Sequence, residues 1–88
     1  MRALILGGGG FIGGSMAARL KAEGNFVRIV DLKVHEYRNI DDIADDYVIG
    51  DLRSKLVVQS TLTPDIDVVY QLAADMGGAG YIFTGEHD

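Results

Sequence analysis

The sequence predicts an α/β fold in which a parallel sheet with strand order 3-2-1-4 carries helices on both faces. The first observation behind this prediction is that short apolar, β-branched runs alternate with helical segments, which is the pattern of βαβ units. The second is that right-handed crossovers between parallel strands favour this order and place the two main helices on opposite faces. The length of 88 residues predicts a single domain over residues 1–88.

The first third of the chain has the pattern of one complete βαβ unit. Residues 3–6 are an uninterrupted apolar run, which is typical of a strand buried on both faces. A helix is predicted from Phe11 to the Gly24-Asn25 pair, and residues 26–31 form the second strand. The apolar stripe of this helix comprises Phe11, Ile12, Met16, Ala17 and Leu20.

The remaining elements are predicted from shorter patterns. One helical turn is expected at residues 40–44, and a short strand at residues 47–49. Residues 53–62 form the second main helix, which ends before Pro64 because proline cannot continue a helix. Residues 67–73 read as the fourth strand.

Composition excludes several classes of protein. The net charge is −5 and no Lys/Arg cluster is present, which excludes a nucleic-acid partner held through counterion release. There are no cysteines, so disulfides and thiolate metal sites are ruled out. The apolar run at residues 1–6 is too short for a signal peptide or a membrane span. We therefore expect a cytoplasmic protein with no membrane partner.

A glycine-rich turn joins the first strand to the first helix. Gly7, Gly10 and Gly13 fit the spacing G-x-x-G-x-x-G. With Gly8 in place of Gly7 the turn also fits G-x-G-x-x-G, so the spacing alone leaves both patterns open. Glycines let the backbone approach a pyrophosphate closely, and the amide groups at the helix start would face its phosphates. The alternative is a tight turn with a purely structural role.

An aspartate follows the second strand at the distance that dinucleotide sites require. Asp31 lies about 20 residues beyond the glycines, where its carboxylate can accept hydrogen bonds from both ribose hydroxyls. It would repel a 2′-phosphate, which favours NAD over NADP, although the cations Arg28 and Lys33 weaken this preference. Together these features predict part of a Rossmann fold with an NAD site. Asp31 could instead cap the strand end, and Asp51 could cap a helix starting at Leu52.

Other titratable residues suggest no chemistry. Four acids could form a metal site, but no glycine-centred calcium loop accompanies them, and we predict a solvated acidic surface. These acids are Asp41, Asp42, Asp45 and Asp46. His35 and His87 have no partners at ligand spacing, so both are predicted to be surface residues and no metal is expected.

Three stretches resemble the NAD-dependent epimerase/dehydratase group of the extended short-chain dehydrogenases/reductases. These are residues 6–14, residues 50–53 and residues 67–74, in the order and at the spacing found in that family. The resemblance implies NAD as the cofactor. The glycine turn, Asp31 and the resemblance together predict which residues contact NAD. These residues are Gly7, Gly10, Phe11, Ile12, Gly13, Asp31, Leu32, Lys33, Asp51, Leu52, Leu72, Ala73 and Ala74.

The stretch at residues 72–82 resembles the corresponding part of the family's nucleotide-sugar epimerases. By this resemblance Met76, Gly77 and Gly78 lie near the nucleotide-sugar substrate; a flexible loop after a strand is the alternative. The family's chemistry uses a Tyr-x-x-x-Lys pair, and none of the four tyrosines is followed by lysine at that distance. Four residues after Tyr37, Tyr47, Tyr70 and Tyr81 stand Asp41, Asp51, Ala74 and Gly85. No catalytic residue is therefore assigned.

Three hypotheses follow. In the first, the chain is a truncated part of a nucleotide-sugar epimerase that binds NAD but catalyses nothing alone, with the substrate bound only when a C-terminal part is present. In the second, it is a nucleotide-binding or regulatory module completed by a partner chain. The third is self-association through the exposed edge of the fourth strand, where Val68, Val69 and Leu72 are poorly covered.

Overall fold

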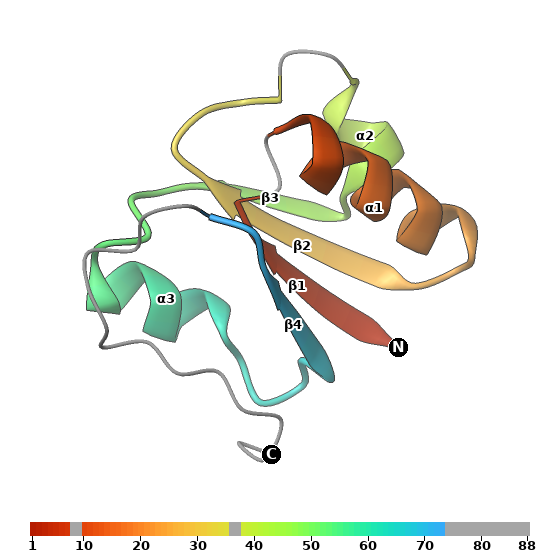
Figure 1. The fold of residues 1–88 in the computed structure, drawn as a ribbon. Coiled ribbons are helices and arrows are strands. Elements are labelled where there is room, and N and C mark those ends of the chain that lie inside the picture. Colours follow the sequence, from red (N-terminus) through yellow and green to blue (C-terminus); the bar gives the residue numbers. More distant parts are fainter. Residues whose placement is uncertain (8–9, 36–37, 74–88) are drawn as a thin grey trace.

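The alternation of strands and helices along the chain is confirmed. The structure is a computed structural model that describes residues 1–7, 10–35 and 38–73 (Figure 1). The elements in order are β1 (Arg2–Leu6), α1 (Phe11–Ala22), β2 (Phe26–Asp31), α2 (Ile40–Ile43), β3 (Asp46–Ile49), α3 (Lys55–Thr61) and β4 (Val68–Gln71).

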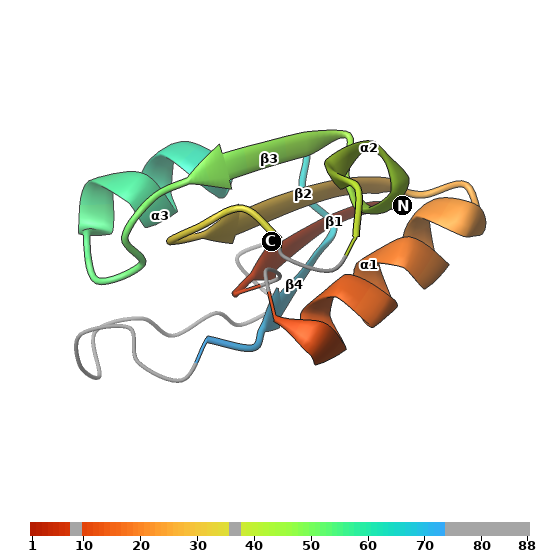
Figure 2. The ribbon, with the colours of Figure 1, turned by 90° about the horizontal axis from the view of Figure 1, so that it is seen from above.

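The four strands form one parallel sheet in the predicted order, β3-β2-β1-β4. Figure 2 shows the strands one after another in this order. In register, Leu6 at the end of β1 faces Val30 of β2 and Gln71 of β4. Asp31, which ends β2, faces Ile49, which ends β3. The carboxyl ends of all four strands therefore meet at one edge of the sheet.

The main helices cover opposite faces of the sheet, as predicted (Figure 1). Because side chains alternate along a strand, β1 contributes side chains to the core on both faces of the sheet. Leu4 and Leu6 pack in one cluster with Val58 of α3, whereas Ile5 packs in the other with Ala17 of α1. All three β1 side chains are fully buried. This double burial explains the uninterrupted apolar run of the first strand.

The second main helix and the fourth strand are both shorter than predicted. The second main helix begins at Lys55 and not at residue 53, because the Ser54 side chain caps it by accepting the Val57 amide. The fourth strand is shorter than residues 67–73. Before it, the Asp67 carboxylate accepts the Arg2 amide at 2.8 Å.

The buried face of α1 also differs from the predicted stripe. Phe11 and Ile12, in the first turn of α1, are 71% and 72% exposed. The buried positions of the helix are Gly13, Gly14 and Ala17. Small residues on this face let the helix axis lie close to the sheet.

The predicted acidic surface is correct for Asp41, Asp42 and Asp45, which are exposed, whereas Asp46 is half-buried. Asp45 also pairs with Lys21, and Asp46 pairs with Arg28, at the amino ends of the strands. Within residues 1–7, 10–35 and 38–73, no group of three or more His, Cys, Asp or Glu side chains could hold a metal ion. Across the same ranges, no helix has the length and apolar character needed to cross a membrane.

Candidate nucleotide site

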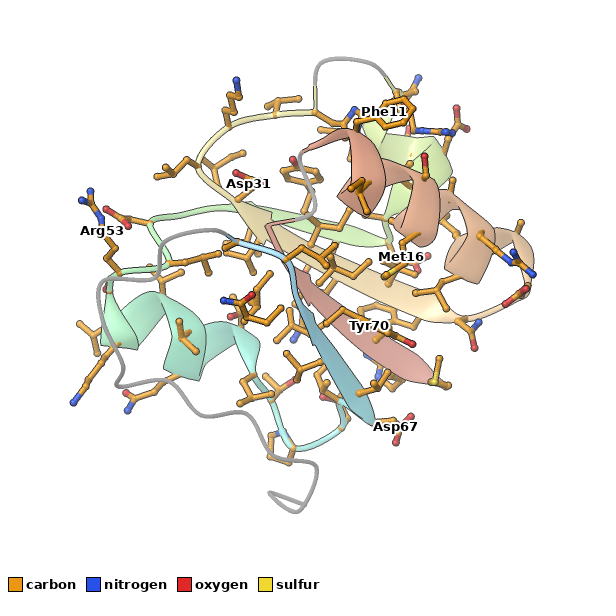
Figure 3. The ribbon with its side chains drawn as sticks, viewed as in Figure 1. Phe11, Met16, Asp31, Arg53, Asp67 and Tyr70 are labelled. Carbon is orange, nitrogen blue, oxygen red and sulfur yellow. The ribbon has the colours of Figure 1, made fainter. Side chains whose placement is uncertain are left out.

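The residues predicted to contact a cofactor come from the carboxyl ends of the four strands. Backbone hydrogen bonds continue past these ends: the Gly7 amide donates to Val30 O at 2.7 Å, and the Leu72 amide donates to Leu6 O at 2.8 Å. Phe11 and Asp31 lie at this end of the sheet in Figure 3, and Asp67 lies at the other end. The sheet therefore brings the glycine turn and the acid after β2 to one edge.

Gly7 occupies the tightest position of the site. Its φ of +90° lies in the left-handed region that favours glycine. A Cβ there would lie 2.7 Å from the backbone nitrogen of Ala73, which follows β4. Gly7 thus allows β1 to turn directly beside the chain leaving β4. Sequence spacing indicated that a glycine was needed, but not that Ala73 was the neighbour.

Gly10 is the N-cap residue of α1 and has open space around it. A Cβ at Gly10 would meet none of the described atoms within 4 Å. Gly10 has no side chain to cap α1, and the first turn of this helix contains no acidic residue. Since the first amides of a helix have no acceptor within it and carry the positive end of its dipole, this turn can receive an anion. Phe11 and Ile12 follow it with exposed side chains.

Asp31 ends β2 beside this turn. One of its carboxylate oxygens accepts the Leu32 amide at 2.6 Å, which orients the group at the sheet edge. Leu32 and Lys33 follow as exposed residues. The Tyr47 hydroxyl donates a hydrogen bond to the backbone oxygen of Lys33 at 2.8 Å. Burial, and secondly the negative charge of Asp31, raise the pKa of Tyr47 above its usual range.

Asp51 follows β3, and it does not cap a helix starting at Leu52. Its carboxylate accepts the Arg53 amide at 2.9 Å and pairs with the Arg53 guanidinium, also at 2.9 Å. This arrangement lowers the pKa of Asp51, with the Arg53 side-chain hydrogen bond as the main cause. The Leu52 side chain is buried in the core beside α3, so a contact from Leu52 to a ligand would come from its backbone.

Leu72 and Ala73 complete the edge after β4. Leu72 is 38% exposed, whereas Ala73 packs against the core cluster under α3 and against Gly7. The other predicted residues of this region lie outside the described residues. They are Ala74 for the cofactor and Met76, Gly77 and Gly78 for the substrate.

His35 is a residue of this edge that sequence reasoning placed wrongly. It was predicted to lie on the surface, yet it is only 6% exposed. Its Nε2 lies 3.2 Å from Gly10 O, and its Nδ1 accepts the Arg38 amide at 2.9 Å. The sequence signal was the Gly13-Gly14 pair inside a helix, because a helix-interior glycine often marks a close packing partner. His87 lies outside the described residues.

The edge as a whole suits a nucleotide that carries a pyrophosphate. It offers an uncapped helix start for the phosphates, and a space at Gly10 that a Cβ would fill. It also offers an oriented carboxylate at Asp31 for the hydroxyls of a ribose.

Comparison with known proteins points to one family. The model of the NAD dependent epimerase/dehydratase family matches residues 3–86. GDP-mannose 3,5-epimerase 1 of Oryza sativa subsp. indica is 42% identical over 84 residues, which is 93% of this chain and 21% of that protein. GDP-mannose 3,5-epimerase of Arabidopsis thaliana is 44% identical over 80 residues, which is 89% of this chain and 20% of that protein. The chain thus spans about a fifth of the length of these relatives.

Solved structures give the same result. A UDP-glucose 4-epimerase matches with a TM-score of 0.68 and 33% identity over 85% of this chain and 23% of its own. An NAD-dependent NDP-hexosamine 5,6-dehydratase involved in tunicamycin biosynthesis matches with a TM-score of 0.63 and 32% identity, over 82% of this chain and 23% of its own. The partial Rossmann fold predicted from the sequence is therefore confirmed.

Proposed function

Because this chain belongs to the NAD-dependent epimerase/dehydratase family, we propose that it binds NAD(H) at the carboxyl edge of its sheet. The observation that carries this proposal is the meeting of two features from different strands. The uncapped start of α1, entered through Gly10, follows β1, and the oriented carboxylate of Asp31 ends β2. These are the two groups that recognise the pyrophosphate and the ribose of a dinucleotide.

Each part of the cofactor has a residue suited to it. The amides of Phe11 and Ile12 would hold the pyrophosphate, and Asp31 would accept from the adenosine ribose. Asp51 and the backbone of Leu52 would lie beside the adenine, and Leu72 and Ala73 would line the path toward the nicotinamide. Ala73 also holds Gly7 in its turn, so the end of β4 shapes the phosphate side of the site.

NAD, when bound, supplies a hydride acceptor and donor. The chain's own residues bind and orient it, and we propose that these 88 residues alone catalyse no turnover. The support is that no tyrosine in the sequence is followed four residues later by the lysine that the family's acid–base chemistry uses. The names of the relatives support a nucleotide sugar as the class of substrate of a protein that contains this cofactor site.

Titration of NAD against the purified chain, followed by calorimetry or by amide shifts, tests the proposal. We expect saturable binding in the millimolar range or tighter, with the amides of Phe11 and Ile12 among those that shift. NADP should bind more weakly, because Asp31 repels the 2′-phosphate. The absence of binding at 10 mM NAD, from a sample with a folded spectrum, would refute it.

Asp31→Asn sharpens the same experiment. The amide keeps a hydrogen-bonding oxygen but loses the charge, so NAD should bind about tenfold more weakly, the loss of one charge-assisted hydrogen bond. The preference for NAD over NADP should narrow. Asp42→Asn is the matched control, because it removes one exposed charge that is not among the proposed site residues and should leave both affinities unchanged.

We also propose a second copy of the chain as a partner at the edge of β4. Within the described part of the chain β4 pairs with β1 alone, and its four residues carry no charge. The other edge strand, β3, begins with Asp46, which carries a charge. Charge on an edge strand opposes pairing with another chain, so β4 is the edge strand that can pair more readily with a second copy.

Light scattering across a hundredfold concentration range tests this association. We expect dimers or larger species that Gln71→Lys shifts toward the monomer, because it adds a charge to the β4 edge. Ile49→Lys, at the end of the other edge strand, should leave the distribution unchanged. A wild-type chain that stays monomeric at millimolar concentration would contradict the proposal.

A further inference from the structure

The contacts of His35 determine which of its nitrogens carries the ring proton. Nδ1 receives the amide hydrogen of Arg38 at 2.9 Å, so this nitrogen must be the acceptor. In the neutral imidazole the proton then lies on Nε2. Nε2 is 3.2 Å from the carbonyl oxygen of Gly10, to which it therefore donates.

The Gly10 carbonyl is the group through which the glycine turn joins α1. It accepts the amide of Gly14 at 2.9 Å, which is the first hydrogen bond of α1. The carbonyl of Gly10 and the amide of Phe11 belong to one planar peptide group, and they point in opposite directions. Whatever holds the carbonyl of Gly10 therefore also aims the Phe11 amide out of the start of the helix.

The space for the imidazole is built into α1. A Cβ at Gly14 would lie 2.1 Å from His35 Nε2, so the ring rests directly on the helix backbone. The segment after β2 makes a second contact with the helix, because the Arg38 guanidinium reaches the Ser15 hydroxyl at 3.4 Å. The segment that begins at Asp31 is thus docked on the first turns of α1.

We propose that His35 is a positioning residue that aims the Phe11 amide at the pyrophosphate and ties the glycine turn to the segment that carries Asp31. The inference rests on the proposed NAD site and adds a residue to it. His35 touches neither phosphate nor ribose; it acts through Gly10. Gly14 is the complementary position, because only a residue without a side chain leaves room for the ring.

The first test needs no ligand and no variant. Nitrogen-15 shifts of the imidazole report the position of the ring proton at pH 8. We expect it on Nε2, and the Nε2 proton should exchange slowly because the ring is buried. A proton on Nδ1 would overturn the inference while leaving the NAD proposal standing.

The second test compares variants in NAD and ADP titrations. His35→Phe keeps a ring over Gly14 but has no donor, so the dissociation constants should rise about three- to tenfold, the value of one hydrogen bond. In His35→Gln the side-chain amide can donate to Gly10, and affinity should stay within about twofold of wild type. Ser15→Ala, which removes only the Arg38 contact, is the matched control and should also stay within about twofold.

The possible results separate the two proposals. Failure of the wild-type chain to bind NAD would refute the proposed function, and the role of His35 with it. If the wild-type chain binds NAD and a folded His35→Phe variant binds it equally well, the proposed role of His35 is refuted while the NAD proposal stands. If His35→Phe does not fold, Gly14→Ala replaces it, since the new methyl group displaces the ring, and an unchanged dissociation constant there would overturn the inference equally.

Discussion

The amino and carboxyl ends of the sheet are held together in different ways. At the amino end, side-chain pairs hold the strands: Arg28 of β2 pairs with Asp46 of β3 at 2.9 Å, and Arg2 of β1 pairs at 2.9 Å with Asp65, in the loop before β4. The Arg2 guanidinium also lies 3.8 Å from the centre of the Phe26 ring. At the carboxyl end, backbone amides continue the ladder past the strands, and apolar side chains such as that of Phe11 are exposed.

This difference separates stability from binding in a small domain. A chain of this size buries about 60–65% of its unfolded surface, so its core alone leaves little margin of stability. Side-chain pairs at the amino end add stability without occupying the edge where the strands end and where NAD is proposed to bind. At the carboxyl end, the backbone at Gly7 and Gly10 and the contact of His35 with Gly10 fix the positions of the groups that line the proposed site. Substitutions of the amino-end side-chain pairs should therefore lower stability without changing the NAD affinity, whereas substitution of Gly10 should lower the NAD affinity with little loss of stability.

The largest effect on stability is expected at the carboxyl end itself, from Gly7→Ala. The left-handed backbone and the overlap with the Ala73 backbone, 2.7 Å from the new Cβ, should together lower the free energy of unfolding by about 3 kcal/mol. Urea denaturation measures this loss. A loss below about 1 kcal/mol would show that the approach of β1 to β4 is not tight.

Gly10→Ala is the matched comparison on the same turn. The backbone of Gly10 has an ordinary φ of −86°, and its Cβ direction is open among the described residues. Stability should fall by about 1 kcal/mol or less, the difference between glycine and alanine as N-cap residues. The NAD affinity should fall about tenfold or more, because the methyl group occupies the approach of the pyrophosphate.

Arg28 was expected to act beside Asp31, but its guanidinium instead pairs with Asp46 at the amino end of the sheet. We therefore expect the opposite pattern from Arg28→Met. The guanidinium of Arg28 donates to Thr61 O at 2.7 Å and to Thr63 Oγ1 at 2.9 Å, in addition to its pair with Asp46. Methionine keeps the apolar stem, so the loss of these bonds should lower the free energy of unfolding by about 2 kcal/mol. The NAD affinity of the folded fraction should not change. A tenfold weaker affinity would contradict the separation of the two ends.

Most of the fold could be predicted from the sequence because its signals are local and strong. The apolar run of β1 and the glycines after it define a buried parallel strand and its turn, and the handedness of crossovers supplies the order. Errors arose where a distant residue decides the outcome. Residue 67 was assigned to a strand, but its carboxylate accepts the amide of Arg2, which lies 65 positions away in the sequence.

The site was predictable where spacing reflects chemistry, as for the glycine turn and Asp31. It was not predictable where three-dimensional packing decides a role. His35 has no partner at a recognisable spacing, and its burial depends on Gly14, which lies in another element. Leu52 matched the family's pattern for a cofactor contact, yet its side chain faces the core. Sequence motifs identify strand ends, but they do not say which side chains turn toward the ligand.

The smallest effect that we expect is a contribution of Asp45, at the amino end of the sheet, to the pH dependence of the free energy of unfolding. Its carboxylate accepts the Val27 amide at 2.8 Å and pairs with Lys21 at 3.2 Å. These contacts, the Val27 hydrogen bond first, lower the pKa of Asp45 in the folded chain below its ordinary value of 3.8. The stability that results is fully present above the unfolded value and is lost as the pH falls through the folded one.

Asp45→Asn should therefore flatten the loss of stability that accompanies a fall in pH below about 5. At pH 7 the loss should be less than about 1 kcal/mol, since the amide oxygen can still accept from Val27 and the pair with Lys21 is partly exposed. Urea denaturation at a series of pH values measures both quantities, with the exposed Asp42→Asn as control. Parallel pH curves for wild type and Asp45→Asn would show that this carboxylate contributes no acid-sensitive stability, and that the amino end is held mainly by its two arginines.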